Sequence, residues 1–195
     1  MSIVQKVQEI FYESAALKTA LAEDQPLQEA IEKTVMDLCA AFHTGGRVLF
    51  CGNGGSAADA QHFAAELTGK FLFERQALDA EALHTNSSYI TAYANDQTYE
   101  GVFARLVQAK GRAGDVLFGI STSGNSRNIV LAFQEAKRIG MKTIALTGAG
   151  GGRLRGEADI LLAVPSSVTP RVQECHILIG HIICQLVEER CCGAS

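Results

Sequence analysis

Two amphipathic helices are predicted within the first 43 residues of the chain. Apolar residues recur there at three- and four-residue spacing, which places them on one face of a helix. They are Val4, Val7, Ile10, Phe11 and Leu17 in the first stretch, and Ile31, Val35, Leu38 and Phe42 in the second. Pro26 lies in the break between the two stretches. Helices of this kind outside an α/β core often cover a sheet edge or pack against a partner subunit, so residues 1–43 are expected to form an N-terminal arm.

From residue 44 onwards, short apolar strands alternate with helices. Strands are predicted over residues 47–51, 115–120, 142–147 and 159–164. A helix over residues 128–140 ends with Lys137, Arg138 and Gly140, a composition typical of a helix C-terminus. Such alternation indicates a parallel sheet covered by helices on both faces. The predicted fold class is α/β, a doubly wound parallel-sheet sandwich of the flavodoxin-like type, with the two N-terminal helices packing outside its core.

Three more elements complete the predicted order. Residues 80–84 are interpreted as a strand and residues 87–94 as a helix. The chain closes with a helix over about residues 170–189. Thr169 is the predicted N-cap of this helix, and Pro170 is expected at its first helical position.

Length and composition restrict the class of protein. A chain of 195 residues, 47% of them hydrophobic, can bury a substantial core, so residues 1–195 are expected to form one domain with an α/β core over residues 44–195. A net charge of −4 argues against a nucleic-acid-binding face. The start of the chain is unlike a signal peptide, and no apolar run approaches the about 20 residues that span a bilayer. We therefore expect a cytoplasmic protein that contacts neither nucleic acid nor membrane.

The six cysteines form no CxxC pair. In a cytoplasmic chain they are expected to be reduced and to act as small, buried hydrophobic residues. The adjacent Cys191 and Cys192 are expected to be exposed thiols. No function is assigned to any of the six.

A first candidate anion site is the loop CGNGGSAA over residues 51–58. It follows a predicted strand and opens a helix, so glycine backbone and unpaired N–H groups can approach an anion, and Ser56 adds a hydroxyl donor. The spacing also fits the dinucleotide fingerprint G-x-G-x-x-A. That alternative is disfavoured because no acidic residue ends a clear second strand about 20 residues later, as ribose binding requires.

A second candidate anion site is the loop GISTSGNSRN over residues 119–128, which again joins a strand to a helix. It supplies four small hydroxyl groups around Gly124, those of Ser121, Thr122, Ser123 and Ser126. Hydroxyls and backbone N–H groups can hold a phosphate monoester without Lys or Arg. A ligand between two such loops is more consistent with a small phosphorylated compound than with a dinucleotide.

The helix after the first loop carries His62 and Glu66 on one face, because the two are four residues apart. The final helix offers Gln173 and His181, which fall within about 80° of each other around the helix axis. His176 points elsewhere and is interpreted as a packing or supporting residue. Composition and spacing alone thus indicate a phosphosugar-type site with acid–base or metal-binding groups.

Five stretches of the chain together resemble the phosphoheptose isomerase family of SIS phosphosugar domains. They are LFCGNGGSAADAQHFAAELTGKF, AYANDQTYEGVFARLV, GDVLFGISTSGNSRNIV, TIALTGAGGGRL and VQECHILIGHIICQLVEE. The resemblance covers nearly the whole chain. It implies an SIS-type fold and an aldose–ketose isomerase, an intramolecular oxidoreductase that converts sedoheptulose 7-phosphate into D-glycero-D-manno-heptose 7-phosphate through an enediol. This reaction leads to the ADP- or GDP-heptose precursors of lipopolysaccharide or S-layer glycans.

The resemblance also implies the roles of individual residues. Glu66 would be the general base and His181 its acid partner. One Zn²⁺ per subunit would be held by His62, Glu66, Gln173 and His181. The substrate would be bound by Asn53, Gly54, Gly55, Ser56, Glu66, Asn95, Asp96, Ser121, Thr122, Ser123, Ser126 and Gln173. Members of the family are homotetramers whose sites take residues from more than one subunit, so a homotetramer is implied here too.

Two alternative functions share these loops. One is a non-catalytic SIS relative that binds the replication initiator DnaA, but that relative lacks the carboxylate and histidine present here as Glu66 and His181. The other is an isomerase for a different sugar phosphate, because the loops do not read the length of a sugar. The chain departs from the family pattern after Arg75, where QALDAEALHTNSSY stands in place of a proline and an aliphatic strand. No role is therefore assigned to Arg75 or to residues 76–90.

Overall fold

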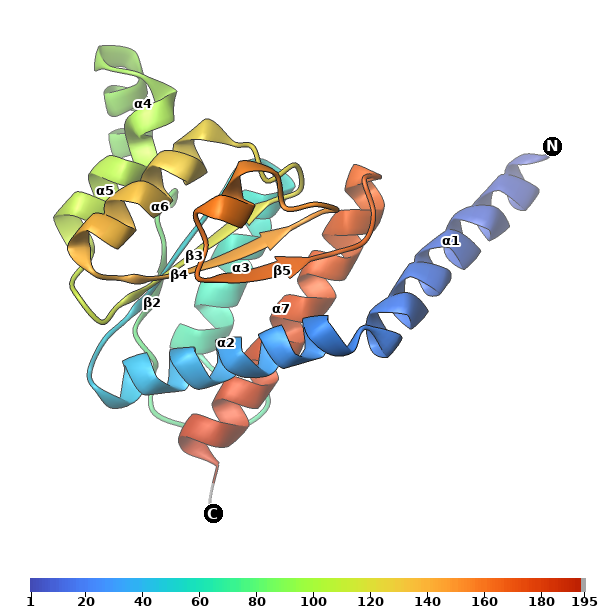
Figure 1. The fold of residues 1–195 in the computed structure, drawn as a ribbon, viewed down its shortest axis with the longest axis horizontal. Coiled ribbons are helices and arrows are strands. Elements are labelled where there is room, and N and C mark those ends of the chain that lie inside the picture. The colour runs from blue at the N-terminus through green and yellow to red at the C-terminus, as the bar shows by residue number, and fades with distance from the viewer. Residues whose placement is uncertain (194–195) are drawn as a thin grey trace.

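The computed structural model describes residues 1–193 and contains a five-stranded parallel sheet with helices on both faces (Figure 1). The strand order is β2-β1-β3-β4-β5. The strands are β1 (Val48–Gly52), β2 (Ala80–Ala82), β3 (Val116–Ser121), β4 (Lys142–Thr147) and β5 (Ile160–Ala163). The doubly wound α/β fold predicted from the alternation of strands and helices is confirmed.

Side chains of one strand enter two separate cores, which explains why the strands are apolar at consecutive positions. Val48 and Phe50 of β1 pack with one group of helices, α2 (Gln25–His43), α3 (Gly55–Thr68) and α7 (Thr169–Cys192). Leu49 and Cys51 pack with α5 (Val102–Lys110) and α6 (Arg127–Ile139) on the other face. Every residue of β1 is buried, as expected for a strand inside a parallel sheet.

The register of β1 and β3 brings two loops together. Val48 pairs with Val116 and Gly52 pairs with Ile120, so the carboxyl ends of these neighbouring strands lie side by side. The loop after β1 leads into α3, and the loop after β3 leads into α6. Ligands of open α/β sheets bind at this edge.

The remaining elements are α4 (Ser87–Asp96) and the 3₁₀ helices η1 (Tyr99–Gly101) and η2 (Gly152–Gly156).

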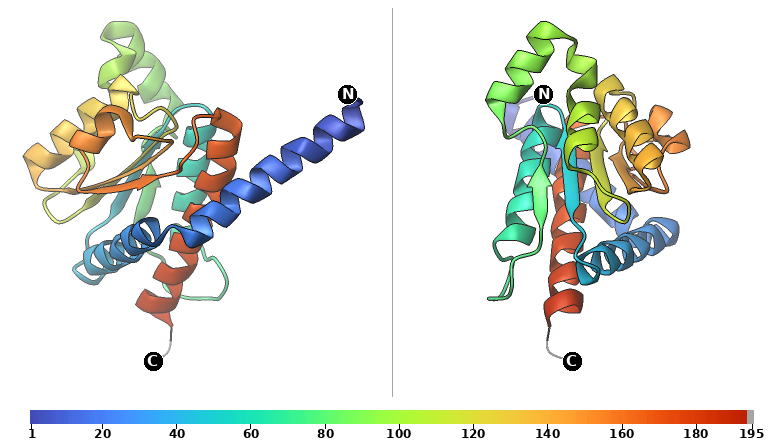
Figure 2. Two further views of the ribbon diagram at one scale, coloured as in Figure 1. Left: turned by 45° about the vertical axis from the view of Figure 1, so that its right-hand side comes forward. Right: turned by 90° about the vertical axis from the view of Figure 1, so that its left-hand side faces the viewer.

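The predicted pair of N-terminal helices is present, and its two members behave differently. α1 (Ile3–Glu23) extends away from the body of the molecule, as two views show (Figures 1 and 2), and Leu21 is its only buried residue. α2 contributes Leu27, Ile31 and Val35 to the core on one face of the sheet. The break between the helices is Asp24, whose carboxylate accepts a hydrogen bond from the backbone N–H of Leu27. Pro26 lies in the first turn of α2 rather than in the break, a position that suits its missing N–H.

Three other local predictions need correction. Thr169 is the first helical residue of α7 and Pro170 the second, and the residue in the N-cap position is Val168. β2 is shorter than residues 80–84. Cys191 and Cys192 are half-buried rather than exposed, because Cys191 packs against the core, whereas the other four cysteines are buried as predicted. Among residues 1–193, no helix combines the length and apolarity that crossing a membrane requires.

Candidate active site

The two predicted anion loops face the same edge of the sheet, and neither of the helices that follow them is capped by a side chain of residues 1–193. The N–H groups of Ser56 and Ala57 donate to backbone carbonyls of the first loop, whereas those of Gly55 in α3 and of Arg127 and Asn128 in α6 have no such partner in the described part of the chain and are available to a ligand. In the second loop, Gly124 has φ +65°, and a Cβ there would lie 2.1 Å from the Gly151 carbonyl oxygen. Glycine is thus required for this loop to pack against the loop after β4.

Hydroxyl groups of the second loop converge. The Oγ atoms of Ser121 and Ser126 are 3.0 Å apart, and those of Ser121 and Ser123 are 3.5 Å apart. Ser121 ends β3 and is buried, whereas Ser126 precedes α6. This cluster at a helix start suits a phosphate group, so Ser121, Ser123 and Ser126 remain the predicted phosphate contacts.

A pair of amides ties the two loops together. The Asn53 Nδ2 atom donates to Asn128 Oδ1 at 3.0 Å, and Asn128 Nδ2 donates to Asn53 Oδ1 at 2.9 Å. The Tyr99 hydroxyl, from η1, also donates to Asn53 Oδ1 at 2.9 Å. The sequence pattern indicated no role for Asn128 or Tyr99, because their contacts with Asn53 join residues far apart in the chain. Asn128 is buried, so this amide pair fixes the spacing of the loops.

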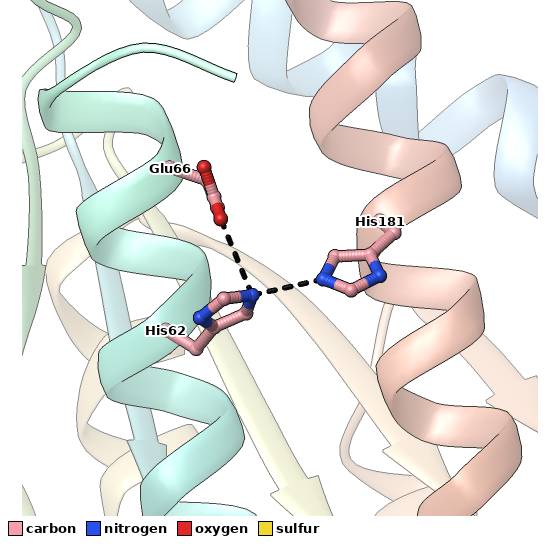
Figure 3. Close-up of side chains that lie close together, drawn as sticks. All are labelled: His62, Glu66 and His181. Atoms are coloured by element: carbon pink, nitrogen blue, oxygen red, sulfur yellow. Dashed lines mark hydrogen bonds and ion pairs between the residues drawn. The ribbon is translucent and has the colours of Figure 1, made fainter. Parts of the chain in front are cut away.

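Three side chains meet between α3 and α7 (Figure 3). The His62 Nε2 atom lies 3.3 Å from Glu66 Oε1 and 2.8 Å from His181 Nε2. One ligand atom from each of the three side chains can be chosen so that all three atoms lie within 4.8 Å of one another. All three residues are partly exposed, so a ligand can reach them. We call this group the His–Glu–His cluster.

The donor atoms of the His–Glu–His cluster fit a divalent metal. Two imidazole nitrogens and one carboxylate oxygen form a ligand set that zinc uses in open, catalytic sites. The Nε2 atoms of His62 and His181 are 2.8 Å apart. At this distance they either share one proton in a hydrogen bond or both direct their lone pairs at a bound cation. The geometry therefore supports metal binding by His62, Glu66 and His181.

Gln173 lies at a different level of α7 from the His–Glu–His cluster. Its side chain packs over the first loop, where a Cβ at Gly55 would lie 2.4 Å from the Gln173 Nε2 atom. Gln173 and His181 are separated by about 12 Å along the helix axis. The observed rotamer thus brings Gln173 to the loop, and its place among the metal ligands stays a prediction.

Asn95 and Asp96 end α4 and are exposed. The Asn95 Nδ2 atom donates to Asp96 Oδ1 at 3.0 Å. Their role as sugar contacts stays a prediction. The same segment continues into η1, from which Tyr99 contacts Asn53, so this part of the chain approaches the first loop.

Asp59 stands one helical turn before His62. Burial raises the pKa of Asp59 to about 6, although the neighbouring His62 offsets part of the shift. Asp59 Oδ2 is buried without a hydrogen-bond partner among residues 1–193. A second acidic group thus adjoins the His–Glu–His cluster.

Arg75 is buried in an ion pair with Glu188.

Comparisons with known proteins agree in the family they indicate. The profile of the SIS domain family matches residues 11–148. The chain is 50% identical over 188 residues to a phosphoheptose isomerase from Mycobacterium tuberculosis, with 96% of each chain covered. It is 51% identical over 177 residues to a phosphoheptose isomerase from Helicobacter pylori, covering 90% of this chain and 92% of the relative.

Solved structures give the same result. The phosphoheptose isomerase from Neisseria gonorrhoeae superposes with a TM-score of 0.91 at 42% identity, covering 96% of this chain and all of that one. The enzyme from Francisella tularensis superposes with a TM-score of 0.92 at 38% identity, covering 97% of this chain and 100% of that one. At these identities the likeness extends beyond the fold.

Proposed function

Because the chain belongs to the phosphoheptose isomerase family of SIS domain proteins, we propose that its site converts sedoheptulose 7-phosphate into D-glycero-D-manno-heptose 7-phosphate. The observation that carries the proposal is the meeting of Glu66 and His181, from helices far apart in the sequence, beside two phosphate-type loops. The curated relatives support the isomerase rather than a non-catalytic DnaA-binding protein.

The spacing of the loops and the cluster suits a long sugar phosphate. Gly55 opens α3 at the first loop, and His62 follows seven residues later. That separation is about 10 Å along the helix axis. A phosphate held at the loops therefore leaves an extended seven-carbon chain with its reacting carbons near the His–Glu–His cluster.

The residues of the cluster match the needs of the reaction. Isomerisation through an enediol removes a proton from C1 of the ketose and returns a proton to C2, while the oxygens exchange protons. Glu66 supplies a carboxylate that can take the carbon-bound proton. His181 supplies an imidazole that can donate to the carbonyl oxygen through the ring nitrogen that does not hold a metal. Asn53, held by Asn128 and Tyr99, stays in place to contact the substrate near its phosphate end.

We assign the resident metal as zinc, held by His62, Glu66 and His181, with Gln173 as a fourth ligand after a change of rotamer. Bound zinc would act as a Lewis acid that polarises the substrate carbonyl. The fit of the donor atoms supports this assignment.

The active form is proposed to be a homotetramer with sites shared between subunits. α1 exposes Ile3, Val4, Val7 and Phe11 to solvent, and an apolar groove of about 670 Å³ lies between α1, α2 and α7. The lining of the groove includes Leu21, Leu27, Ile31, Val35, Ile179 and Ile182. Apolar surface of this extent supports burial against further copies of the chain. Light scattering coupled to size-exclusion chromatography tests this oligomeric state directly.

The proposed activity is tested by incubating the purified protein with sedoheptulose 7-phosphate and resolving the sugar phosphates by anion-exchange chromatography. The wild-type protein should form the aldose phosphate. The variant His181→Ala should form it far more slowly, because it lacks both the proton donor and one of the proposed zinc ligands. Absence of product from the wild-type protein, with and without added zinc, would overturn the proposed function.

A further inference from the structure

A buried ion pair lies beside the His–Glu–His cluster, in a part of the chain that the reaction does not use. The Arg75 Nε atom lies 3.1 Å from Glu188 Oε1, and the two side chains are 2% and 0% exposed. Arg75 belongs to the segment between α3 and β2, and Glu188 belongs to α7. Burying two charges is costly unless their hydrogen bonds are satisfied, so the partners of each side chain identify what the pair does.

Glu188 organises the segment that follows α3. Its carboxylate accepts hydrogen bonds from the backbone N–H groups of Phe71 at 2.8 Å, Leu72 at 2.6 Å and Phe73 at 3.4 Å. Burial alone would raise the pKa of Glu188, but these donors and Arg75 outweigh it and hold the pKa below its ordinary value. The carboxylate is therefore charged and acts as the anchor of this segment.

Arg75 fixes the end of α3, the helix that carries Glu66. Its Nη2 atom donates to the backbone carbonyl of Glu66 at 2.7 Å, and its Nη1 atom donates to the carbonyl of Gly69 at 2.9 Å. Carbonyl groups in the last turn of a helix lack partners within the helix, and a cation there also complements the helix dipole. The guanidinium group thus holds the turn from which the Glu66 side chain projects.

The same segment contacts the other member of the acid–base pair. The centroid of the Phe71 ring lies 5.7 Å from that of the His181 ring. Glu188 stands seven residues after His181 on α7, and seven residues correspond to about two helical turns, so the two share a face of that helix. The ion pair is therefore connected to both residues. Arg75 bonds the backbone carbonyl of Glu66, and Glu188 bonds the backbone N–H of Phe71, whose ring packs against His181.

We propose that Arg75 and Glu188 are positioning residues that hold the Glu66 carboxylate and the His181 imidazole at their working separation. The proposal rests on the proposed function. The segment after α3 would thus contribute to catalysis by holding these two side chains in place, without contacting the substrate. A displacement of about 1 Å at reacting groups can cost on the order of a hundredfold in rate, so small movements of this segment should be measurable.

The decisive variant is Glu188→Gln, which keeps the shape of the side chain and removes its charge. The matched control is Asp115→Asn. Asp115 is another buried carboxylate that accepts two backbone N–H bonds, from Arg47 at 3.0 Å and Arg112 at 2.8 Å, but at the amino ends of the strands. Both substitutions remove the charge of a carboxylate bonded to backbone N–H groups, and only one of these carboxylates adjoins the site.

Steady-state kinetics with the zinc-loaded, full-length protein give the first readout. Glu188→Gln should lower kcat by about tenfold or more while KM for sedoheptulose 7-phosphate changes by less than about twofold, because the phosphate loops lie at the other end of α3. Asp115→Asn should leave both constants unchanged. A wild-type kcat in Glu188→Gln, or an equal loss in both variants, would overturn the proposal.

Zinc affinity gives a second readout that does not depend on the reaction. In competition with a chromogenic chelator, Glu188→Gln should bind zinc about tenfold more weakly than the wild-type protein, since supporting groups tune metal affinity by such factors. Arg75→Lys, which keeps the charge but loses the planar fork of donors, provides the same test if Glu188→Gln does not fold. Unchanged zinc affinity in the folded variant would contradict the proposal even if the true substrate were another sugar phosphate. An inert wild-type protein that binds zinc would contradict only the proposed function.

Discussion

The Nε2 atom of His62 lies 2.8 Å from the Nε2 atom of His181, although 119 residues separate the two in the sequence. The contact joins α3, which begins at the first anion loop, to α7, the last helix of the chain. Glu66 completes the group from the next turn of α3. Metal-binding and acid–base groups are thereby assembled by the packing of two helices against the same face of the sheet.

Removal of one ring should abolish tight zinc binding. His62→Ala should weaken zinc affinity by roughly a hundredfold or more, because the site loses one of its two imidazole ligands. His43→Ala is the matched control, since His43 is exposed on α2. Chelator competition at pH 7.5 measures both variants. Stoichiometric zinc at wild-type affinity in His62→Ala would show that the metal lies elsewhere.

The amide pair between the loops predicts an effect on substrate affinity. In Asn128→Asp the new carboxylate cannot donate to Asn53 Oδ1, and it brings a negative charge to the phosphate loops. KM for the sugar phosphate should rise by about tenfold or more, the equivalent of about 1.4 kcal/mol. Asn86→Asp serves as control, because Asn86 caps α4 and aspartate can make the same bond. Equal KM values in both variants would separate Asn128 from substrate binding.

A buried histidine predicts how stability depends on pH. Burial lowers the pKa of His176 to about 4, and the Thr147 backbone offsets only part of the shift. The unfolded chain takes up this proton near pH 6.5 and the folded chain only near pH 4, so stability is lost as pH falls between these values. The full decrease in the free energy of unfolding that is due to His176 would be about 3 kcal/mol.

The His176 contribution can be isolated by comparing the wild-type protein with His176→Leu in urea denaturation at several pH values. The difference between the two proteins in the free energy of unfolding cancels the contributions of other titrating groups. One of these groups is Asp59, whose raised pKa makes the fold more stable as the pH falls from 6 to 4. The free energy of unfolding of the variant should fall less between pH 6.5 and pH 4. Parallel curves for the two proteins would show that His176 does not resist protonation in the fold.

The sequence predicted those features that depend on neighbouring residues. β1 and β3 follow from continuous apolar runs, and the end of α6 follows from Gly140, which adopts φ +91° at the C-cap. His62 and Glu66 could be paired because helical spacing places them on one face. The position of His181 beside them followed only from the family resemblance, since no local pattern shows how α7 packs against α3.

Residues whose role depends on distant partners escaped prediction. Glu188 stands in the charged run VEER, which is typical of a solvated helix end, yet Arg75 and the segment after α3 bury it completely. Asn128 received no role from the sequence because its partner Asn53 lies 75 residues away in the chain. Pro26 and Thr169 were each misplaced by a small shift of a helix start, because several neighbouring residues suit that position equally well.

Isomerisation in deuterium oxide, followed by proton NMR, tests the acid–base assignment most directly. The wild-type protein should convert sedoheptulose 7-phosphate into an aldose phosphate that carries deuterium at C2, because the proton taken by Glu66 exchanges with solvent. Glu66→Gln should retain binding of the sugar phosphate and lose turnover by about 10²- to 10⁴-fold. Wild-type turnover and labelling in Glu66→Gln would contradict the role of Glu66 as the base.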